Sequence, residues 1–208
     1  YYDHWFDREG IAFERFSRQG MCRRKMLDYL SSLGYKTPPY GTPSDVRMQL
    51  IQIDPQLQEI EELSRKHNAY FLDVVVYMDE YAHCGEGKIV IPLHKAMEHY
   101  PNHLCSLFIA PLPGAATSLR CLQIGDRRFL LQYTSRDDWR SNCGDVEITI
   151  LAQKQEYHPK INLPLFAIDF IANTGELLAV DFNTAPQIRH TGIENLLPAK
   201  EAAEVIKK

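Results

Sequence analysis

The sequence predicts an α+β fold with two lobes, in which helices are combined with antiparallel hairpins. Segments with apolar residues at helical spacing are separated by apolar runs that are typical of buried strands. Two runs flank a Gly-Asp turn within residues 118–134, and two more flank a glycine-containing turn within residues 164–183. Short turns join antiparallel strands, whereas parallel strands need a long crossover. We therefore expect sheets made of hairpins.

Helical spacing first appears over residues 23–33. Gly34 follows at the position where glycine commonly ends a helix. The spacing comes from an apolar stripe made of Met26, Leu27, Leu30 and Leu33. A stripe of this kind predicts a helix that packs on the protein core.

Three further helices are expected along the chain. Asp54 as N-cap and Pro55 at the first helical position predict a helix that extends to about Arg65. Helical spacing over residues 93–100 outlines a shorter one. Pro198 begins the last predicted helix, whose terminal lysines suit a helix C-terminus.

Two aspartates carry most of the functional information, because each interrupts an apolar run that predicts a buried strand. Asp169 lies within residues 163–171, and Asp181 lies within residues 177–183. A buried carboxylate is costly unless a cation, a metal or several hydrogen-bond donors face it. The turn at Gly175 folds the chain back and sets the two aspartates across from each other. We therefore expect a cation between them.

The side chains around Asp181 predict what kind of cation this is. Alternation along a strand puts Asn183 on the same side as Asp181, and Val180 and Phe182 on the opposite side. Asp169, Asp181 and Asn183 would then form a group of hard oxygen ligands. Such a group suits Mg²⁺ or Mn²⁺, and neither run contains the His or Cys that would indicate zinc. The alternative is that each aspartate pairs with an arginine in a structural salt bridge.

Asp169, the run from Asp181 to Pro186, and the later Thr-Gly-Ile at 191–193 together resemble a known metal motif. It is the C-terminal motif of the ATP-grasp carboxylate-amine ligases, in particular the branch that adds glutamate to ribosomal protein tails. There, an Asp on one strand and a Glu-x-Asn on the next hold Mg²⁺ ions against the ATP phosphates. The resemblance implies that Asp169, Asp181 and Asn183 are metal ligands. It also implies an ATP-grasp fold, whose two α+β lobes with antiparallel sheets enclose a nucleotide.

The same resemblance implies two catalytic arginines. Residues 118–128 are similar to the family's Asp-x-Arg hairpin, with Arg120 retained and Ser118 in the acidic place. Residues 139–142 resemble the family's Arg-x-Asn segment, whose Arg reaches the transferring phosphoryl group and whose Asn helps to hold metal. Arg140 and Arg120 are therefore the predicted catalytic residues. The alternative for each is a salt bridge with a surface acid.

The nucleotide side of the resemblance departs further from the family. Residues 74–78 look like the strand that carries an ATP-contacting lysine, but Tyr77 or Met78 fills that position. Lys88, or Lys95 on the next helix, is available to supply the missing charge. The glycine-rich segment before Lys88 resembles the family's loop over the phosphates, with a plain hairpin turn as the alternative. The implied nucleotide contacts, including those of an adenine-binding hinge, are Gly85, Gly87, Lys88, Leu107 and Ile109.

Domain organisation follows from how far the resemblance extends. It predicts an N-terminal segment over residues 1–20, a remnant of a preceding domain, and an ATP-grasp domain over residues 21–208. Within that domain, residues from about 60 to 110 form the nucleotide-binding lobe and residues from about 111 to 208 form the metal-binding lobe. The family has an additional N-terminal α/β domain, and this chain begins at Tyr1 rather than Met. We therefore expect a fragment of a longer protein.

Composition argues against two classes of binding partner, nucleic acids and membranes. A net charge of −4 and a pI near 6.1 argue against nucleic-acid binding. The 5 cysteines lack metal-ligand spacing and are expected to be reduced thiols in the cytoplasm. No apolar run reaches the length of a membrane span, and neither end has a cationic-then-apolar leader, so no membrane partner is expected. The oligomeric state is left open.

The resemblance implies an ATP- and Mg²⁺-dependent ligase that joins a carboxylate to an amine, or to a thiol, through an acylphosphate. Its expected substrates are small-molecule or peptide carboxylates and amines. An alternative is a non-catalytic, ATP-grasp-like module that binds nucleotide as a sensor, which the replaced lysine favours. A further alternative is a truncated lobe that functions only with its N-terminal domain attached.

Overall fold

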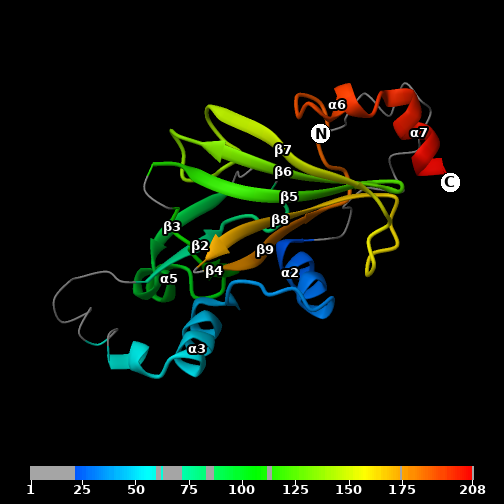
Figure 1. The fold of residues 1–208 in the computed structure, drawn as a ribbon. Helices are drawn as coiled ribbons and strands as arrows, with labels where there is room; N and C mark the ends of the chain where they lie inside the picture. The colour runs from blue at the N-terminus through cyan, green and yellow to red at the C-terminus, as the bar shows by residue number, and fades with distance from the viewer. Residues whose placement is uncertain are drawn as a thin grey trace.

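The protein combines two antiparallel sheets with helices packed on them (Figure 1). The computed structural model describes residues 22–59, 62, 72–82, 87–111, 114–173 and 175–207. Every strand pair in this part of the chain is antiparallel. The predicted α+β class is therefore confirmed.

The smaller, four-stranded sheet packs one face on two helices. Its strands are β1 (Tyr40–Gly41), β2 (Asp73–Tyr77), β3 (Lys88–Pro92) and β4 (Cys105–Leu107), in the order β1-β4-β2-β3. Val74 and Val76 are buried against α3 (Pro43–Ile53) and α5 (Leu93–His99). Because side chains alternate along a strand, Tyr77 points to the opposite face, toward the second sheet.

The larger, five-stranded sheet contains both predicted hairpins. Its strands are β5 (Ala116–Ile124), β6 (Arg127–Ser135), β7 (Val146–Gln155), β8 (Leu165–Asn173) and β9 (Glu176–Asn183), in the order β7-β6-β5-β8-β9. Gly125 lies in the turn between β5 and β6, and Gly175 lies in the turn between β8 and β9. The expected facing of the aspartates is also confirmed, because Asp169 pairs with Asp181 in the register.

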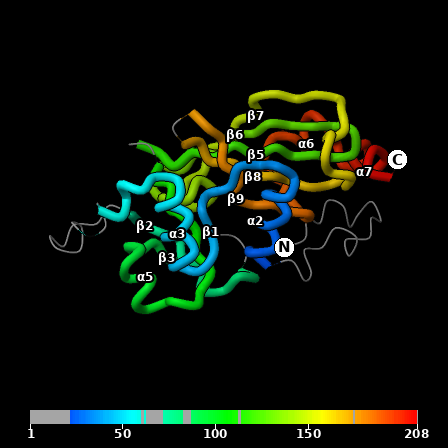
Figure 2. The backbone as a smooth tube through the Cα atoms, turned by 90° about the horizontal axis from the view of Figure 1, so that it is seen from below, coloured from blue at the N-terminus to red at the C-terminus, as the bar shows by residue number. Residues whose placement is uncertain are grey.

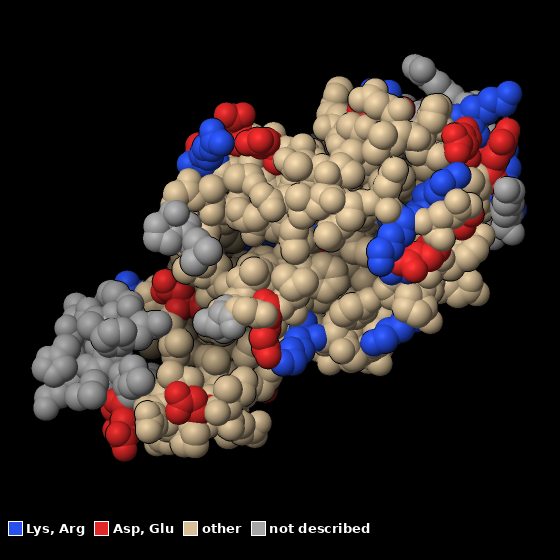
Figure 3. Space-filling view, in the orientation of Figure 1, with Lys and Arg blue, Asp and Glu red and all other residues tan. Residues whose placement is uncertain are grey.

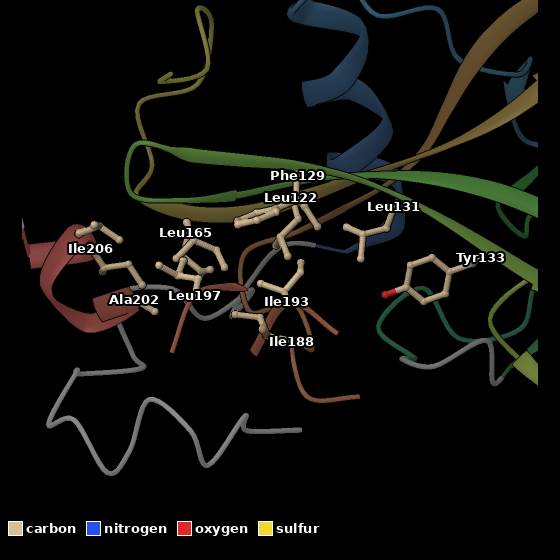
Figure 4. Packing of buried hydrophobic residues seen from close by; sticks show 13 residues of the cluster. Leu122, Phe129, Leu131, Tyr133, Leu165, Ile188, Ile193, Leu197, Ala202 and Ile206 are labelled. Atoms are coloured by element: carbon tan, nitrogen blue, oxygen red, sulfur yellow. The ribbon is translucent and has the colours of Figure 1, made fainter. Parts of the chain in front are cut away.

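Each face of the five-stranded sheet carries its own apolar cluster. On one face, Phe166 packs with Leu30 of helix α2 (Arg23–Ser32). The other face packs on α6 (Ile193–Leu196) and α7 (Ala199–Lys207), which lie at the end of the sheet away from the four-stranded sheet (Figures 1 and 2). Residues of this second cluster include Leu122, Phe129, Leu131, Tyr133, Leu165, Ile188, Ile193, Leu197, Ala202 and Ile206 (Figure 4).

An irregularity in the β8–β9 pairing corrects one predicted orientation. The register passes from Asp169 opposite Asp181 to Phe170 opposite Ala179, so Val180 is an extra residue on β9. An extra residue of this kind interrupts the strict alternation of side chains. Phe182 lies in the cluster with α2, as predicted. Val180 was predicted to face away from Asp181, but it lines the same pocket as Asp181.

Most predicted helices are present at the expected positions. The helix expected over residues 23–33 is α2, and the two later ones are α5 and α7. At the helix predicted from Asp54, the Asp54 carboxylate accepts a hydrogen bond from the Gln56 backbone N–H at 3.0 Å. Residues 60, 61 and 63–71, over which this helix was expected to continue, lie outside the described residues.

Helix α3 and strand β7 are the longest of the elements that were not predicted from the sequence. Helix α3 begins at a capping box, in which the Thr42 side chain accepts from the Asp45 N–H and the Asp45 carboxylate accepts from the Thr42 N–H. Strand β7 lies at the edge of the five-stranded sheet and pairs only with β6. The predicted segment 1–20 lies outside the described residues, and the predicted lobe limits stay predictions.

Charged side chains of both signs share the molecular surface. On the face shown in Figure 3, basic and acidic groups lie next to one another at several places. No helix in the described part of the chain combines the length and the apolar character needed to cross a bilayer.

Candidate functional site

A pocket lies between the two sheets, with walls from β2, β3 and β4 on one side and from β5, β6, β8 and β9 on the other. It comprises about 950 Å³ of space, with open solvent at its mouth included. Seven of the residues implied by the family resemblance line it together: Lys88, Leu107, Ile109, Arg120, Arg140, Asp169 and Asp181. Residues from five separate strands and two loops thus meet at one place.

Arg120 and Asp169 form a two-point ion pair in the floor of this pocket. Arg120 Nε donates to Asp169 Oδ1 at 2.7 Å, and Arg120 Nη2 donates to Asp169 Oδ2 at 2.8 Å. The two residues face each other in the β5–β8 register, so the sheet itself holds them together. Burial alone would lower the pKa of Arg120, but Asp169 outweighs burial and the pKa is raised. Arg120 therefore stays cationic.

Arg23 and Asp181 form a second ion pair, which joins helix α2 to the sheet. Arg23 Nη1 donates to Asp181 Oδ1 at 2.7 Å, and the side chains are 5% and 25% exposed. Burial would lower the pKa of Arg23, but Asp181 again outweighs it and the pKa is raised. Both aspartates thus pair with an arginine, which is the alternative that the sequence left open.

Tyr77, which with Met78 is one of two candidates for the position of the family's lysine, has a cation near its ring from each of two elements. The guanidinium carbon of Arg23 is 5.5 Å from the ring centroid, and Lys88 Nζ is 5.7 Å from it. The Tyr77 hydroxyl is hydrogen-bonded to the Ser106 hydroxyl at 3.0 Å. Burial, together with the nearby Arg23, lowers the pKa of Lys88 to about 8, against the opposing effect of Asp181. Lys88 is thus a half-buried amine that an anionic ligand would stabilise as a cation.

Arg140 reaches the pocket from the loop between β6 and β7. Its Nε and Nη2 donate to the Asp138 carboxylate at 2.9 and 2.7 Å. These hydrogen bonds from Arg140 lower the pKa of Asp138 to about 2. The same loop is tied to β5, because the Ser141 hydroxyl donates to the Ser118 hydroxyl at 2.6 Å. Both serines line the pocket, so hydroxyls stand where the resemblance expects an acid.

The remaining wall is apolar and includes the predicted hinge. The N–H of Leu107 donates to the Pro39 carbonyl at 2.9 Å, which fixes the start of the hinge beside β1. Phe108 meets Trp139 edge-on, with ring centroids 5.5 Å apart, so the four-stranded sheet and the β6–β7 loop touch at the pocket. Together with Ile109, these residues provide a surface suited to a flat apolar group.

The donor set fits a divalent cation only in part. Asp169 and Asp181 are carboxylates paired across adjacent strands and exposed to the same pocket. Among the described residues, no cluster of three or more His, Cys, Asp or Glu side chains could hold a metal. A cation here would therefore use these carboxylates and complete its shell with amide oxygen, water and phosphate, as Mg²⁺ commonly does.

Two described site residues that were predicted, Asn183 and Gly87, are not among the residues that line the pocket. Asn183 Oδ1 accepts from the Ala185 backbone N–H at 2.9 Å, and Asn183 is not among the pocket-lining residues, whereas Asn142 is. Gly87 ends the glycine-rich loop, and its N-terminal neighbours, with Gly85, lie outside the described residues. The metal and nucleotide roles of these positions stay predictions.

Arg23 is the main site residue that sequence reasoning missed. It begins the helix and stands three, four and seven positions before Met26, Leu27 and Leu30, on the same apolar stripe. An arginine on such a stripe must be paired with an acid when the helix packs. That spacing could have identified Arg23 as a partner for one of the two buried aspartates.

Comparison with known proteins supports the fold that the resemblance implied. No protein-family model matches the chain, and no curated protein matches it. A structure of the ATP-grasp ligase PsnB with minimal precursor, Mg and ADP is similar at a TM-score of 0.53 and 13% identity, over 97% of this chain and 63% of that one. The RimK domain protein ATP-grasp from Sphaerobacter thermophilus is similar at 0.50 and 12% identity, over 93% of this chain and 69% of that one.

These similarities define the class of fold. Both structures are ATP-grasp proteins, and each aligns with nearly all of this chain. The chain therefore has the ATP-grasp fold, as the C-terminal motif implied. It spans about two thirds of the length of these neighbours.

Proposed function

We propose that this chain is the nucleotide-binding and metal-binding part of an ATP-dependent ligase that joins a carboxylate to an amine, or to a thiol, through an acylphosphate. The observation that carries the proposal is the charge arrangement of the pocket. Lys88, Arg120 and Arg140 converge on it from three elements, beside the carboxylates of Asp169 and Asp181. Phosphoryl transfer asks a protein mainly for positive charge and positioning around the phosphate oxygens.

The proposed reaction begins at the γ-phosphorus of ATP. A substrate carboxylate oxygen attacks it, the bond from that phosphorus to the bridging oxygen breaks, and ADP leaves. The amine then attacks the acyl carbon, inorganic phosphate leaves with its bonding electron pair, and the nitrogen loses a proton. Arg140 and Arg120 would bind the charged oxygens of the transferring phosphoryl group, because a guanidinium can donate two parallel hydrogen bonds to such oxygens.

Each wall of the pocket has a role in this proposal. Lys88, whose Nζ lies near the Tyr77 ring, would supply the positive charge for the phosphate chain that the family's lysine supplies. Leu107 and Ile109 would contact the base on the apolar side. Asp169 and Asp181, with Asn183 or Asn142 as the amide, would hold Mg²⁺. When bound, that ion would neutralise phosphate charge and orient the leaving group.

Small-molecule or peptide carboxylates and amines are the proposed substrates. The PsnB structure holds a minimal precursor together with Mg and ADP, which supports a similar class of ligand here. The pocket itself adds Ser118 and Ser141 beside Arg140, a set of donors that suits a carboxylate.

Calorimetric titration of ATP and ADP, with and without Mg²⁺, tests the site. We expect magnesium-dependent binding to the wild-type chain and its loss in Asp181→Ala. Glu147→Ala is the matched control, because that carboxylate is 66% exposed and lies on β7. Wild-type protein that binds no nucleotide under any of these conditions would rule out the proposal for this chain.

Trapping the intermediate tests the chemistry. Hydroxylamine converts an acylphosphate to a hydroxamate, so ATP, a panel of amino acids and peptides, and hydroxylamine should yield hydroxamate and ADP in equal amounts. Asp169→Asn should lower this yield strongly without unfolding the chain. An Asp169→Asn variant that retains full activity contradicts the assignment.

A non-catalytic nucleotide-binding module is the second candidate. Tyr77 in place of the expected lysine favours it, as do the arginine partners of both pocket carboxylates. The two proposals differ in one readout. The module binds nucleotide but yields neither ADP nor hydroxamate with any carboxylate in the panel.

A further inference from the structure

We infer that Arg23 is an internal counter-ion that keeps Asp181 from binding a divalent cation until nucleotide phosphate draws the guanidinium away. The inference rests on the proposed function, because it concerns the metal and nucleotide sites of the same pocket. Arg23 is thus a positioning residue, because it controls when the Asp181 carboxylate can bind metal. The metal site then forms only in the nucleotide complex.

The first step is that arginine and metal compete for the same two carboxylates. Both oxygens of Asp169 accept from Arg120, and Asp181 Oδ1 accepts from Arg23. A divalent cation needs these oxygens as its inner ligands. The guanidinium charges would repel a divalent cation at these carboxylates, so tight metal binding requires at least one guanidinium to move, and the free energy of breaking that ion pair is subtracted from the metal affinity.

The second step is that the two ion pairs are not equally able to open. Arg120 and Asp169 face each other across adjacent strands and share two hydrogen bonds, with side chains 10% and 15% exposed. Arg23 comes from helix α2, and Asp181 is 25% exposed on the edge strand β9. Opening the Arg120 pair would strain the centre of the sheet. Opening the Arg23 pair requires rotation of a side chain that is 5% exposed, at the first residue of a helix, but no separation of paired strands.

The third step is that phosphate offers Arg23 an alternative partner close by. Arg23 and Lys88 lie about equally far from the Tyr77 ring, at 5.5 and 5.7 Å, and both line the pocket. The two cations repel each other, and Arg23 is one cause of the lowered pKa of Lys88. A polyphosphate placed between them would relieve the repulsion and accept from both groups. Asp181 Oδ1 would then no longer accept from Arg23 and would face the same phosphate.

The consequence is a reciprocal coupling between nucleotide and metal. A ligand that moves Arg23 raises the metal affinity, and a metal on Asp181 raises the nucleotide affinity by the same factor. In the nucleotide-free protein, the Arg23 pair neutralises Asp181 and lets the pocket exist without metal. Removing the guanidinium should therefore create a metal site in the absence of nucleotide.

Binding of Mn²⁺, measured by the loss of the free-ion EPR signal, tests this directly. We expect nucleotide-free Arg23→Met to bind Mn²⁺ at least about tenfold more tightly than the nucleotide-free wild type. A tenfold change in affinity corresponds to only part of the free energy of breaking a buried ion pair. Arg23→Lys is the matched control, because it keeps the positive charge and should show no gain. The double variant Arg23→Met/Asp181→Asn should lose the gain.

A second readout uses thermal unfolding. Mn²⁺ should raise the Tm of Arg23→Met, in which the guanidinium no longer faces Asp181, and should leave the Tm of the wild type unchanged. If Arg23→Met does not fold, the wild type alone decides the question: adding ADP should increase its Mn²⁺ binding beyond that of ADP and protein titrated separately.

The outcomes separate this inference from the proposed function. Wild-type protein that binds Mn²⁺ equally tightly with and without ADP overturns the inference and leaves the metal site in place. An Arg23→Met variant that folds but gains no Mn²⁺ binding also overturns it. Absence of ADP binding to the wild type overturns the proposed function itself.

Discussion

The same face of the five-stranded sheet is apolar at one end and charged at the other. On β5, Leu122 and Ile124 lie under α6 and α7, whereas Ser118 and Arg120 of the same face line the pocket. Along β8 the same change occurs between Leu165 and Asp169. Burial at the covered end stabilises the strands, and this allows the open end to hold costly buried charges.

Tyr133 marks the boundary between these two ends. Its ring belongs to the apolar cluster and stands at the far end of it from Ile206 (Figure 4). Its hydroxyl accepts from Arg120 Nη1 at 3.2 Å, and the guanidinium carbon lies 4.7 Å from the ring centroid. Stability and chemistry therefore depend on neighbouring residues of the same strands. The comparison predicts that substitutions at each end have separable effects.

The largest effect is expected at the charged end. Arg120→Met leaves Asp169 without its partner and should lower the free energy of unfolding by about 3–5 kcal/mol, because one charge of a buried pair is then uncompensated. Urea denaturation at neutral pH measures this. Arg136→Met, at a side chain that is 75% exposed, should change stability by no more than about 0.5 kcal/mol. An equal cost in both variants would mean that the Arg120 pair is not a buried pair in solution.

The covered end should affect stability without affecting ligand binding. Leu131→Ala removes a fully buried side chain from the cluster beneath α6 and should cost about 2–5 kcal/mol. The folded protein should bind ADP as the wild type does, since Leu131 does not line the pocket. Calorimetry below the Tm checks this. A large loss of ADP affinity in folded Leu131→Ala would show that the two ends are not separable.

Local signals explain which part of the site could be predicted from the sequence. The facing of Asp169 and Asp181 depends on a short turn at Gly175, and turn chemistry is visible in a few residues. The extra residue Val180 has no such signal. Arg120 and Arg23, by contrast, lie 49 and 158 positions from the aspartates they bind, so their pairing depends on the tertiary fold.

The parts of the fold that could be predicted are those marked by local sequence signals. Apolar stripes and the two hairpin turns identified most elements, and the ATP-grasp motif at the C-terminus implied how they assemble. Helix α3 was missed although its capping box is visible from Thr42 to Asp45. Strand β7 was missed although Val146, Ile148 and Ile150 alternate with polar residues and pack on the core cluster; its second half, from Leu151, is exposed at the sheet edge, where only pairing with β6 defines the strand.

A smaller effect is expected from Lys88, in opposite directions for stability and binding. Its pKa of about 8 in the folded protein lies below the usual 10.5, so between these values the unfolded chain holds the extra proton. Stability should therefore rise with pH across this window, because the unfolded state binds more protons. Nucleotide affinity should fall across the same window, since phosphate prefers the protonated amine. Titrations of ADP at several pH values and urea curves measure the two trends.

Lys88→Met should remove both trends. At neutral pH it should weaken ADP binding by about tenfold, the value of one charged contact. Met keeps the length of the apolar stem, so the loss reports the charge. Unchanged ADP affinity in this variant, with the pH trend intact, would assign the phosphate contact to another cation.

The smallest effect on stability is expected at the Gly175 turn, which can be compared with the Gly125 turn at the other end of the sheet. Gly175 and Gly125 both have positive φ, at 86° and 55°, where an added Cβ costs about 1–2 kcal/mol. A Cβ at Gly175 would meet no described atom within 4 Å, so Gly175→Ala should cost only this backbone strain. A Cβ at Gly125 would lie 2.3 Å from the Val205 carbonyl oxygen, so Gly125→Ala must also displace α7. Urea denaturation should therefore show a larger loss for Gly125→Ala. Equal losses would mean that α7 does not cover this end of the sheet in solution, and the contrast between a covered and an open end would then lose its physical basis.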